Sequence, residues 1–175
     1  LHLFAAIAHS WADEYEKGVF HARAALAEAR PEWGTVRGYA WIHLGTMTHY
    51  LSGGTEGLKA LAQGDRWVYL EPVRARKQLG ICFVDWLCGD TGKLLQTARH
   101  GLELTHHMPG YSASILHYFA GSACYERNDL DTAAYHFSAI LEQRYLAQPI
   151  VFVLGAVGQA LIYQAKNMAD EARRM

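Results

Sequence analysis

Apolar residues recur along the chain every three or four positions, and short polar turns separate these apolar stretches. This spacing is typical of amphipathic helices. We expect helices at residues 2–12, 14–29, 35–51, 54–68, 71–88, 91–106, 112–127, 130–145 and 149–165, and from residue 168 onward. Only the run 150–153 favours a strand, because it is rich in β-branched residues. Its place in the regular helical pattern outweighs that preference, so the sequence predicts an all-α fold.

The pattern of small residues and turns recurs at a regular interval. It is carried by the segments 43–61, 80–98, 119–137 and 158–172. The small-residue position that opens the second helix of each segment falls at Gly57, Leu94, Ala133 and Ala172, and one further step of similar size back reaches Gly18. A fixed period, here roughly 39 residues, indicates a helical-repeat protein. The sequence therefore predicts one repeat domain divided at about 1–34, 35–69, 70–110, 111–147 and 148–175.

Each predicted repeat is a helix, a short turn, a second helix and a longer linker. The first helices share a small residue at one position, namely Gly45, Cys82, Gly121 and Ala160. A small side chain there lets the second helix pack at a short interaxial distance. Asp90 and Asp129 stand where an N-cap residue belongs. Linkers at 29–34, 107–112 and 148–149 contain proline, which ends one helix and can begin the next.

The segment 125–137, YERNDLDTAAYHF, resembles a tetratricopeptide repeat, although the signature Trp and Pro positions of that repeat are mostly absent from the chain. The length of the period and the segment 37–45, RGYAWIHLG, make the resemblance more specific. The chain resembles the sensor solenoid of MalT-like, LuxR-type transcription activators, which are ATP-dependent STAND regulators. The resemblance implies a right-handed superhelical solenoid of four to five antiparallel helix pairs.

The same resemblance implies a function. In that family a nucleotide-binding switch domain precedes the solenoid and a helix-turn-helix domain follows it, and the solenoid receives an inducer. We therefore expect a non-catalytic sensor domain that is a fragment of a larger regulator, with ATP bound only by a separate domain and no cofactor in this chain. The segment 89–94, GDTGKL, lacks the glycine spacing and the final Ser or Thr of a phosphate-binding loop. The alternative is a generic scaffold that binds a peptide or helix of a partner protein.

Charge and composition limit the partners. The chain has 16 Lys and Arg against 17 Asp and Glu, a net charge of -1, so it lacks the basic field that drives direct nucleic-acid contact. The longest weakly polar run, 150–163, is too short to cross a bilayer. Three cysteines, Cys82, Cys88 and Cys124, have no pairing pattern and are expected to be small core residues in a reducing compartment. We expect a cytoplasmic protein.

In a tetratricopeptide-like stack the first helices line the concave groove. The repeat register assigns to this groove Trp11, Tyr39, His49, Tyr50, Arg76, Phe83, Trp86, Tyr118, Tyr125, Glu126 and Gln164. Aromatic faces interleaved with polar side chains suit a sugar ring or a peptide, with the polar groups fixing its orientation. The alternative is that the aromatic residues belong to the core, which is the commoner role of aromatics at helical spacing.

Other kinds of site find less support. His100, His106, His107 and His117 lie near one linker, but their spacing matches no metal-binding motif. No local arrangement joins a nucleophile to a base, so we predict no catalysis. The sequence also allows self-association through the apolar residues of the first and last long helices, Leu3, Phe4 and Ile7 and Val153, Val157 and Leu161.

Overall fold

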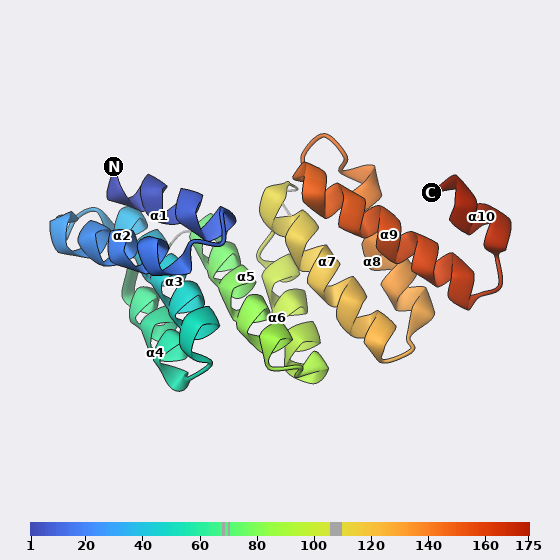
Figure 1. The fold of residues 1–175 in the computed structure, drawn as a ribbon, viewed down its shortest axis with the longest axis horizontal. Coiled ribbons are helices and arrows are strands. Elements are labelled where there is room, and N and C mark those ends of the chain that lie inside the picture. Colours follow the sequence, from blue (N-terminus) through green and yellow to red (C-terminus); the bar gives the residue numbers. More distant parts are fainter. Residues whose placement is uncertain (68, 70, 106–109) are drawn as a thin grey trace. The chain divides into compact units, whose positions relative to one another are not determined.

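The computed structural model describes residues 1–67, 69, 71–105 and 110–175 (Figure 1). Its α-helices are α1 (His2–Trp11), α2 (Tyr15–Glu28), α3 (Gly34–Ser52), α4 (Thr55–Gln63), α5 (Glu71–Leu87), α6 (Thr91–Glu103), α7 (Tyr111–Glu126), α8 (Leu130–Glu142), α9 (Pro149–Ala165) and α10 (Ala169–Arg174). A 3-10 turn, η1 (Gly64–Trp67), follows α4. No described residue lies in a β-strand. The prediction of an all-α fold is confirmed.

The helices form two compact units, an N-terminal unit (Leu1–Cys88) and a C-terminal unit (Gly89–Met175). In the N-terminal unit, α3 packs against α1, α2, α4 and α5. In the C-terminal unit, α7 packs against α6, α8 and α9, and α9 also packs against α8 and α10. Within each unit the described α-helices therefore contact helices that lie one or two places away along the chain.

The predicted helix bounds lie within three residues of the bounds in the structure, with one exception. Residues 68 and 106, where two predicted helices end, and residues 107–109 of a predicted linker lie outside the described residues. The helix predicted over 54–68 is α4, which ends at Gln63, followed by η1. The winding changes at Gly64, which is buried and lies close to Trp41 of α3. Glycine has a low helix propensity, so the α-helix gives way there to the tighter 3-10 turn.

The two predicted N-caps are confirmed. The Asp90 carboxylate accepts a hydrogen bond from the backbone N–H of Lys93 at 3.0 Å, at the start of α6. The Asp129 carboxylate accepts one from the backbone N–H of Thr132 at 3.3 Å, at the start of α8. Each bond satisfies a donor that the first turn of a helix leaves without a partner.

A residue in the left-handed backbone region stands in each of the turns that connect α1 to α2, α3 to α4, α5 to α6, α7 to α8 and α9 to α10. These residues are Asp13, Gly53, Gly89, Asn128 and Asn167, with φ between 57° and 71°. Asn, Asp and Gly tolerate this conformation better than other residues. The five positions follow one another at nearly equal intervals, close to the period of the sequence pattern.

In the N-terminal unit, α3 and α4 meet backbone against backbone. A Cβ atom at Gly45 would lie 2.7 Å from the carbonyl oxygen of Gly57, and a Cβ at Gly57 would lie 2.5 Å from the carbonyl oxygen of Gly45. Neither position has room for a side chain. The prediction that Gly45 allows close packing of the second helix is confirmed. Cys82, at the equivalent position of α5, is also fully buried.

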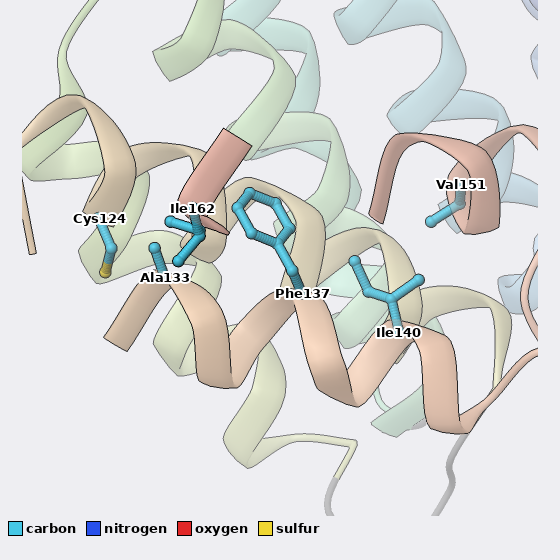
Figure 2. Packing of buried hydrophobic residues seen from close by; sticks show 6 residues of the cluster. All are labelled: Cys124, Ala133, Phe137, Ile140, Val151 and Ile162. Atoms are coloured by element: carbon cyan, nitrogen blue, oxygen red, sulfur yellow. The ribbon is translucent and has the colours of Figure 1, made fainter. Parts of the chain in front are cut away.

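In the C-terminal unit, the core is built around Phe137 of α8. Figure 2 shows Phe137 with Cys124 of α7, Ala133 and Ile140 of α8, and Val151 and Ile162 of α9. The ring fills the space beside two glycines, since a Cβ at Gly121 of α7 or at Gly158 of α9 would lie 2.8 or 2.6 Å from its Cε1 atom. The absence of a side chain at Gly121 of α7 therefore leaves room for the ring of Phe137 from α8.

Candidate binding surface

Helix α5 has one buried side and one side that carries exposed aromatic residues. Val73 and Val84 are buried in a cluster with Ile42 of α3 and Leu61 of α4. Away from this cluster, the side chains of Phe83 and Trp86 are 37% and 46% exposed. Their rings meet edge to face, with centroids 5.9 Å apart and planes at 82°. This is a favoured aromatic geometry, so the two rings hold each other in place at the surface.

Arg76 extends this surface toward the start of α5. It precedes Phe83 by about two helical turns, so both side chains leave the same side of the helix. Arg76 is half-buried. Burial of His43 on α3, and then the nearby Arg76 charge, lower the pKa of His43 to about 3. The imidazole of His43 is therefore neutral near neutral pH. The positive charge of Arg76 lies near enough to contribute to this lowering of the pKa.

His43 was not among the residues predicted from the sequence. It is 7% exposed, and its Nε2 atom has no hydrogen-bond partner in the described structure. Buried polar atoms of native proteins are normally hydrogen-bonded. The sequence contains a signal for this residue, because His43 is one helical turn after the predicted Tyr39 on the same helix. Tyr39 itself is half-buried against the cluster of Ile42 and Leu61.

The other predicted residues of the N-terminal unit differ in exposure. Trp11 lies at the end of α1 and is exposed. Tyr50 is partly exposed and its ring packs on Tyr15 of α2, with centroids 4.1 Å apart. His49 is only 5% exposed and its Nδ1 atom lies 2.9 Å from the Gly54 carbonyl oxygen. His49 therefore lies inside the unit, while Trp11 and Tyr50 are accessible to solvent.

The predicted aromatic residues of the C-terminal unit take part in packing. Tyr118 and Tyr125 of α7 are half-buried and lie against the cluster that contains Phe137. Glu126 and Gln164, at the ends of α7 and α9, are exposed. Tyr118 and Tyr125 therefore fit the alternative interpretation of the sequence, in which the aromatic residues pack against the core. Of the predicted residues, the structure brings Phe83 and Trp86 together into an exposed aromatic pair.

The histidines form pairs between helices. The Nδ1 atoms of His2 and His21 lie 2.8 Å apart across α1 and α2, and those of His117 and His136 lie 2.9 Å apart across α7 and α8. The Nδ1 atom of His100 lies 3.6 Å from a carboxylate oxygen of Glu103. His106 and His107 lie outside the described residues. Within the described ranges, no three His, Cys, Asp or Glu side chains are grouped so that they could hold a metal ion.

The cysteines do not share one environment. Cys82 and Cys124 are buried, as predicted, whereas Cys88 is exposed, so the prediction that all three are core residues is wrong for Cys88. Cys88 directly follows the last residue of α5, where the chain leaves the helix for a turn. Its backbone N–H still closes the last helical turn on the carbonyl of Val84. The backbone at this position is therefore held by the helix, and the side chain is exposed at its end.

In the described part of the chain, no helix is both long enough and apolar enough to span a membrane. Comparison with known proteins gives no relative from which to infer a function. No protein-family model, no curated protein and no solved structure matches this chain.

Proposed function

We propose that this chain is the ligand- or partner-sensing domain of a transcription regulator, and that it binds without catalysing a reaction. The exposed pair of Phe83 and Trp86 on α5 carries the proposal. Two aromatic rings held together at the surface bury a large area when a partner covers them, at low conformational cost. The binding surface consists of Phe83, Trp86 and Arg76, with His43 beside Arg76.

The proposal includes a tetratricopeptide-like repeat, and two features of the structure support that part of it. The left-handed turn residues recur at nearly equal intervals, close to the sequence period. In addition, first helices of neighbouring predicted repeats pack together, α3 with α1 and α5 in one unit and α7 with α9 in the other. Helical repeats of this kind present extended surfaces of their first helices for binding. The surface on α5 belongs to such a first helix.

The chemistry of the surface defines the class of ligand. The aromatic pair can stack on a sugar ring or on another aromatic group. The guanidinium group of Arg76 can donate paired hydrogen bonds to a carboxylate or to hydroxyl groups. His43 is buried beside Arg76 and its Nε2 atom is not accessible to a ligand, so the polar contacts of this surface come from Arg76. We therefore expect an oligosaccharide, an aromatic acid or a short peptide with an aromatic or acidic residue.

A thermal-shift screen against oligosaccharides, amino acids, short peptides and aromatic acids tests the proposal. A ligand that binds only the folded chain raises its melting temperature by mass action. We expect the rise caused by such a ligand to disappear in Trp86→Ala and to persist in Tyr125→Ala. Tyr125 is the matched control because it is an aromatic residue that packs in the other unit.

The screen also separates the sensor from a general interaction scaffold. A small molecule that depends on Trp86 supports the sensor. Binding by peptides alone, with the same dependence on Trp86, favours a scaffold for a partner protein. If every ligand-induced rise persists in Trp86→Ala, the surface on α5 is not the binding site and the proposal fails.

A further inference from the structure

Cys88 and His49 form a pair that the function proposed above does not use. The Sγ atom of Cys88 lies 3.8 Å from the Nε2 atom of His49, which is in the last turn of α3. The two residues are 39 positions apart in the sequence, one period of the repeat. The thiol is exposed, whereas the imidazole is 5% exposed. An accessible nucleophile therefore lies against a buried base.

The hydrogen bond on the other side of the imidazole determines the direction of the contact. The Nδ1 atom of His49 lies 2.9 Å from the carbonyl oxygen of Gly54. A carbonyl oxygen only accepts, so Nδ1 carries the hydrogen and donates it. In the neutral ring Nε2 then has a free lone pair directed at the sulfur. Cys88 donates its S–H hydrogen to Nε2.

This arrangement has the three parts of an activated nucleophile: a thiol, a base within reach and a third group that orients the base. The other two cysteines, Cys82 and Cys124, are buried. Burial raises the pKa of Cys82 and of Cys124, so both stay protonated inside their units. Among the three cysteines, the structure therefore combines exposure with an adjacent base only at Cys88.

We propose that Cys88 is a modification site that undergoes thiol–disulfide exchange with low-molecular-weight disulfides, with His49 as the base. His49 Nε2 takes the thiol proton, and the Cys88 thiolate attacks one sulfur of the disulfide. A new S–S bond forms between Cys88 and that sulfur while the original S–S bond breaks. The released thiolate takes a proton from the imidazolium ring and leaves as a thiol. Cys88 is oxidised to a mixed disulfide and half of the reagent is reduced.

The experiment follows the reaction of the folded chain with hydroxyethyl disulfide, a small uncharged probe, at pH 7. Intact mass gives the number of adducts and peptide mapping gives their positions. We expect one adduct, on Cys88, and none in Cys88→Ser. A free thiol is only a few per cent thiolate at pH 7, which leaves room for a base to accelerate the reaction by roughly tenfold. We therefore expect His49→Gln to slow the reaction about tenfold, with His100→Gln as the control for replacing an exposed histidine.

Unfolding of the His49→Gln variant would not produce a slower reaction at Cys88. Unfolding exposes all three thiols, so a misfolded His49→Gln chain gives more adducts, not a slower reaction at Cys88. A second measurement needs no variant: the rate at Cys88 is compared between the folded chain and the same chain in concentrated urea at the same pH. We expect the folded chain to react faster at Cys88 despite its lower accessibility. Equal rates in wild type and His49→Gln, or a faster reaction at Cys88 in urea, would overturn the proposal.

Discussion

The phenyl ring of Phe137 occupies the space that a side chain at Gly158 would need. A Cβ atom at Gly158 would lie 2.6 Å from the ring, which joins α8 to α9. We expect Gly158→Leu to destabilise the fold by roughly 1–3 kcal/mol, because overpacking forces the ring and its neighbours to shift. Urea unfolding followed by circular dichroism measures the change. Gly92→Leu is the control, since the nearest atoms to a Cβ there lie at 3.5 Å or more.

The same contact makes the two positions interdependent. Phe137→Ala alone should cost about 3–5 kcal/mol, because it leaves a cavity in the core of the C-terminal unit. Combined with Gly158→Leu, the new leucine can enter that cavity. We expect the double variant to be more stable than the sum of the two single changes, by an amount that a double-mutant cycle measures. Strict additivity would show that the ring does not block position 158.

Acid should destabilise the fold through its buried histidines. Burial, then His117 and Arg99, lower the pKa of His136 to about 4, while Asp129 acts in the opposite direction. The ordinary pKa of a histidine in an unfolded chain is 6.5. Between these two values the unfolded chain binds more protons than the folded one, so the free energy of unfolding falls as the pH drops from about 6.5 toward 4. Urea unfolding at pH 7.5 and at pH 4.5 measures this fall.

The variant His136→Gln tests the origin of that pH dependence. It removes one group that the folded chain keeps neutral, so its loss of stability between the two pH values should be smaller than in wild type. His100→Gln replaces an exposed histidine and serves as the comparison. An unchanged pH dependence in His136→Gln would exclude His136 as a source of the effect.

The cap at Asp129 should contribute measurably to α8. Asp129→Ala removes the acceptor for the Thr132 N–H, and we expect a loss of about 1 kcal/mol. Asp129→Asn keeps a side-chain oxygen at the same position and should lose much less. Thermal unfolding of the three chains gives the comparison. Equal losses in both variants would mean that the charge, and not the hydrogen bond, stabilises the helix.

The exposed stripe on α9 should cause weak self-association. Ile150, Val153, Val157 and Leu161 are all partly exposed and recur at helical spacing. An apolar stripe of this kind favours contact with another apolar surface. We expect the sedimentation coefficient to rise with concentration, and Val157→Glu to abolish that rise. A concentration-independent coefficient for wild type would contradict the expectation.

The sequence was sufficient for the helices because the signals for them are local. The spacing of apolar residues, the caps at Asp90 and Asp129 and the turn residues all act within a few positions of the chain. The small residue at Gly45 is predicted from a different signal, because small residues recur at the same position of the repeated pattern. What the sequence did not specify was which side chain fills the space beside a small residue. Phe137 lies next to glycines of two different helices, and only the packed structure shows this.

The candidate site was harder to predict because periodicity does not distinguish an exposed aromatic residue from a buried one. Trp86 and Tyr125 were selected by the same repeat register, yet the first is exposed and the second packs against the core. The pair of His49 and Cys88 was missed although its separation of one repeat period was a usable signal. Residues one period apart, near the ends of neighbouring first helices, are candidates for contact. His49 and Cys88 are two reactive side chains with this separation.

The contacts of each helix with near neighbours along the chain also have a kinetic consequence. A chain whose contacts are local has a low contact order, and such chains fold fast because little loop-closure entropy is lost before contacts form. In each unit, the helices that pack around α3 or α7 lie within two places of that helix along the chain. We therefore expect folding of each unit to start at more than one pair of contacting helices. Several parallel folding routes are then expected in each unit, and a substitution in one helix pair should slow only the routes that begin there.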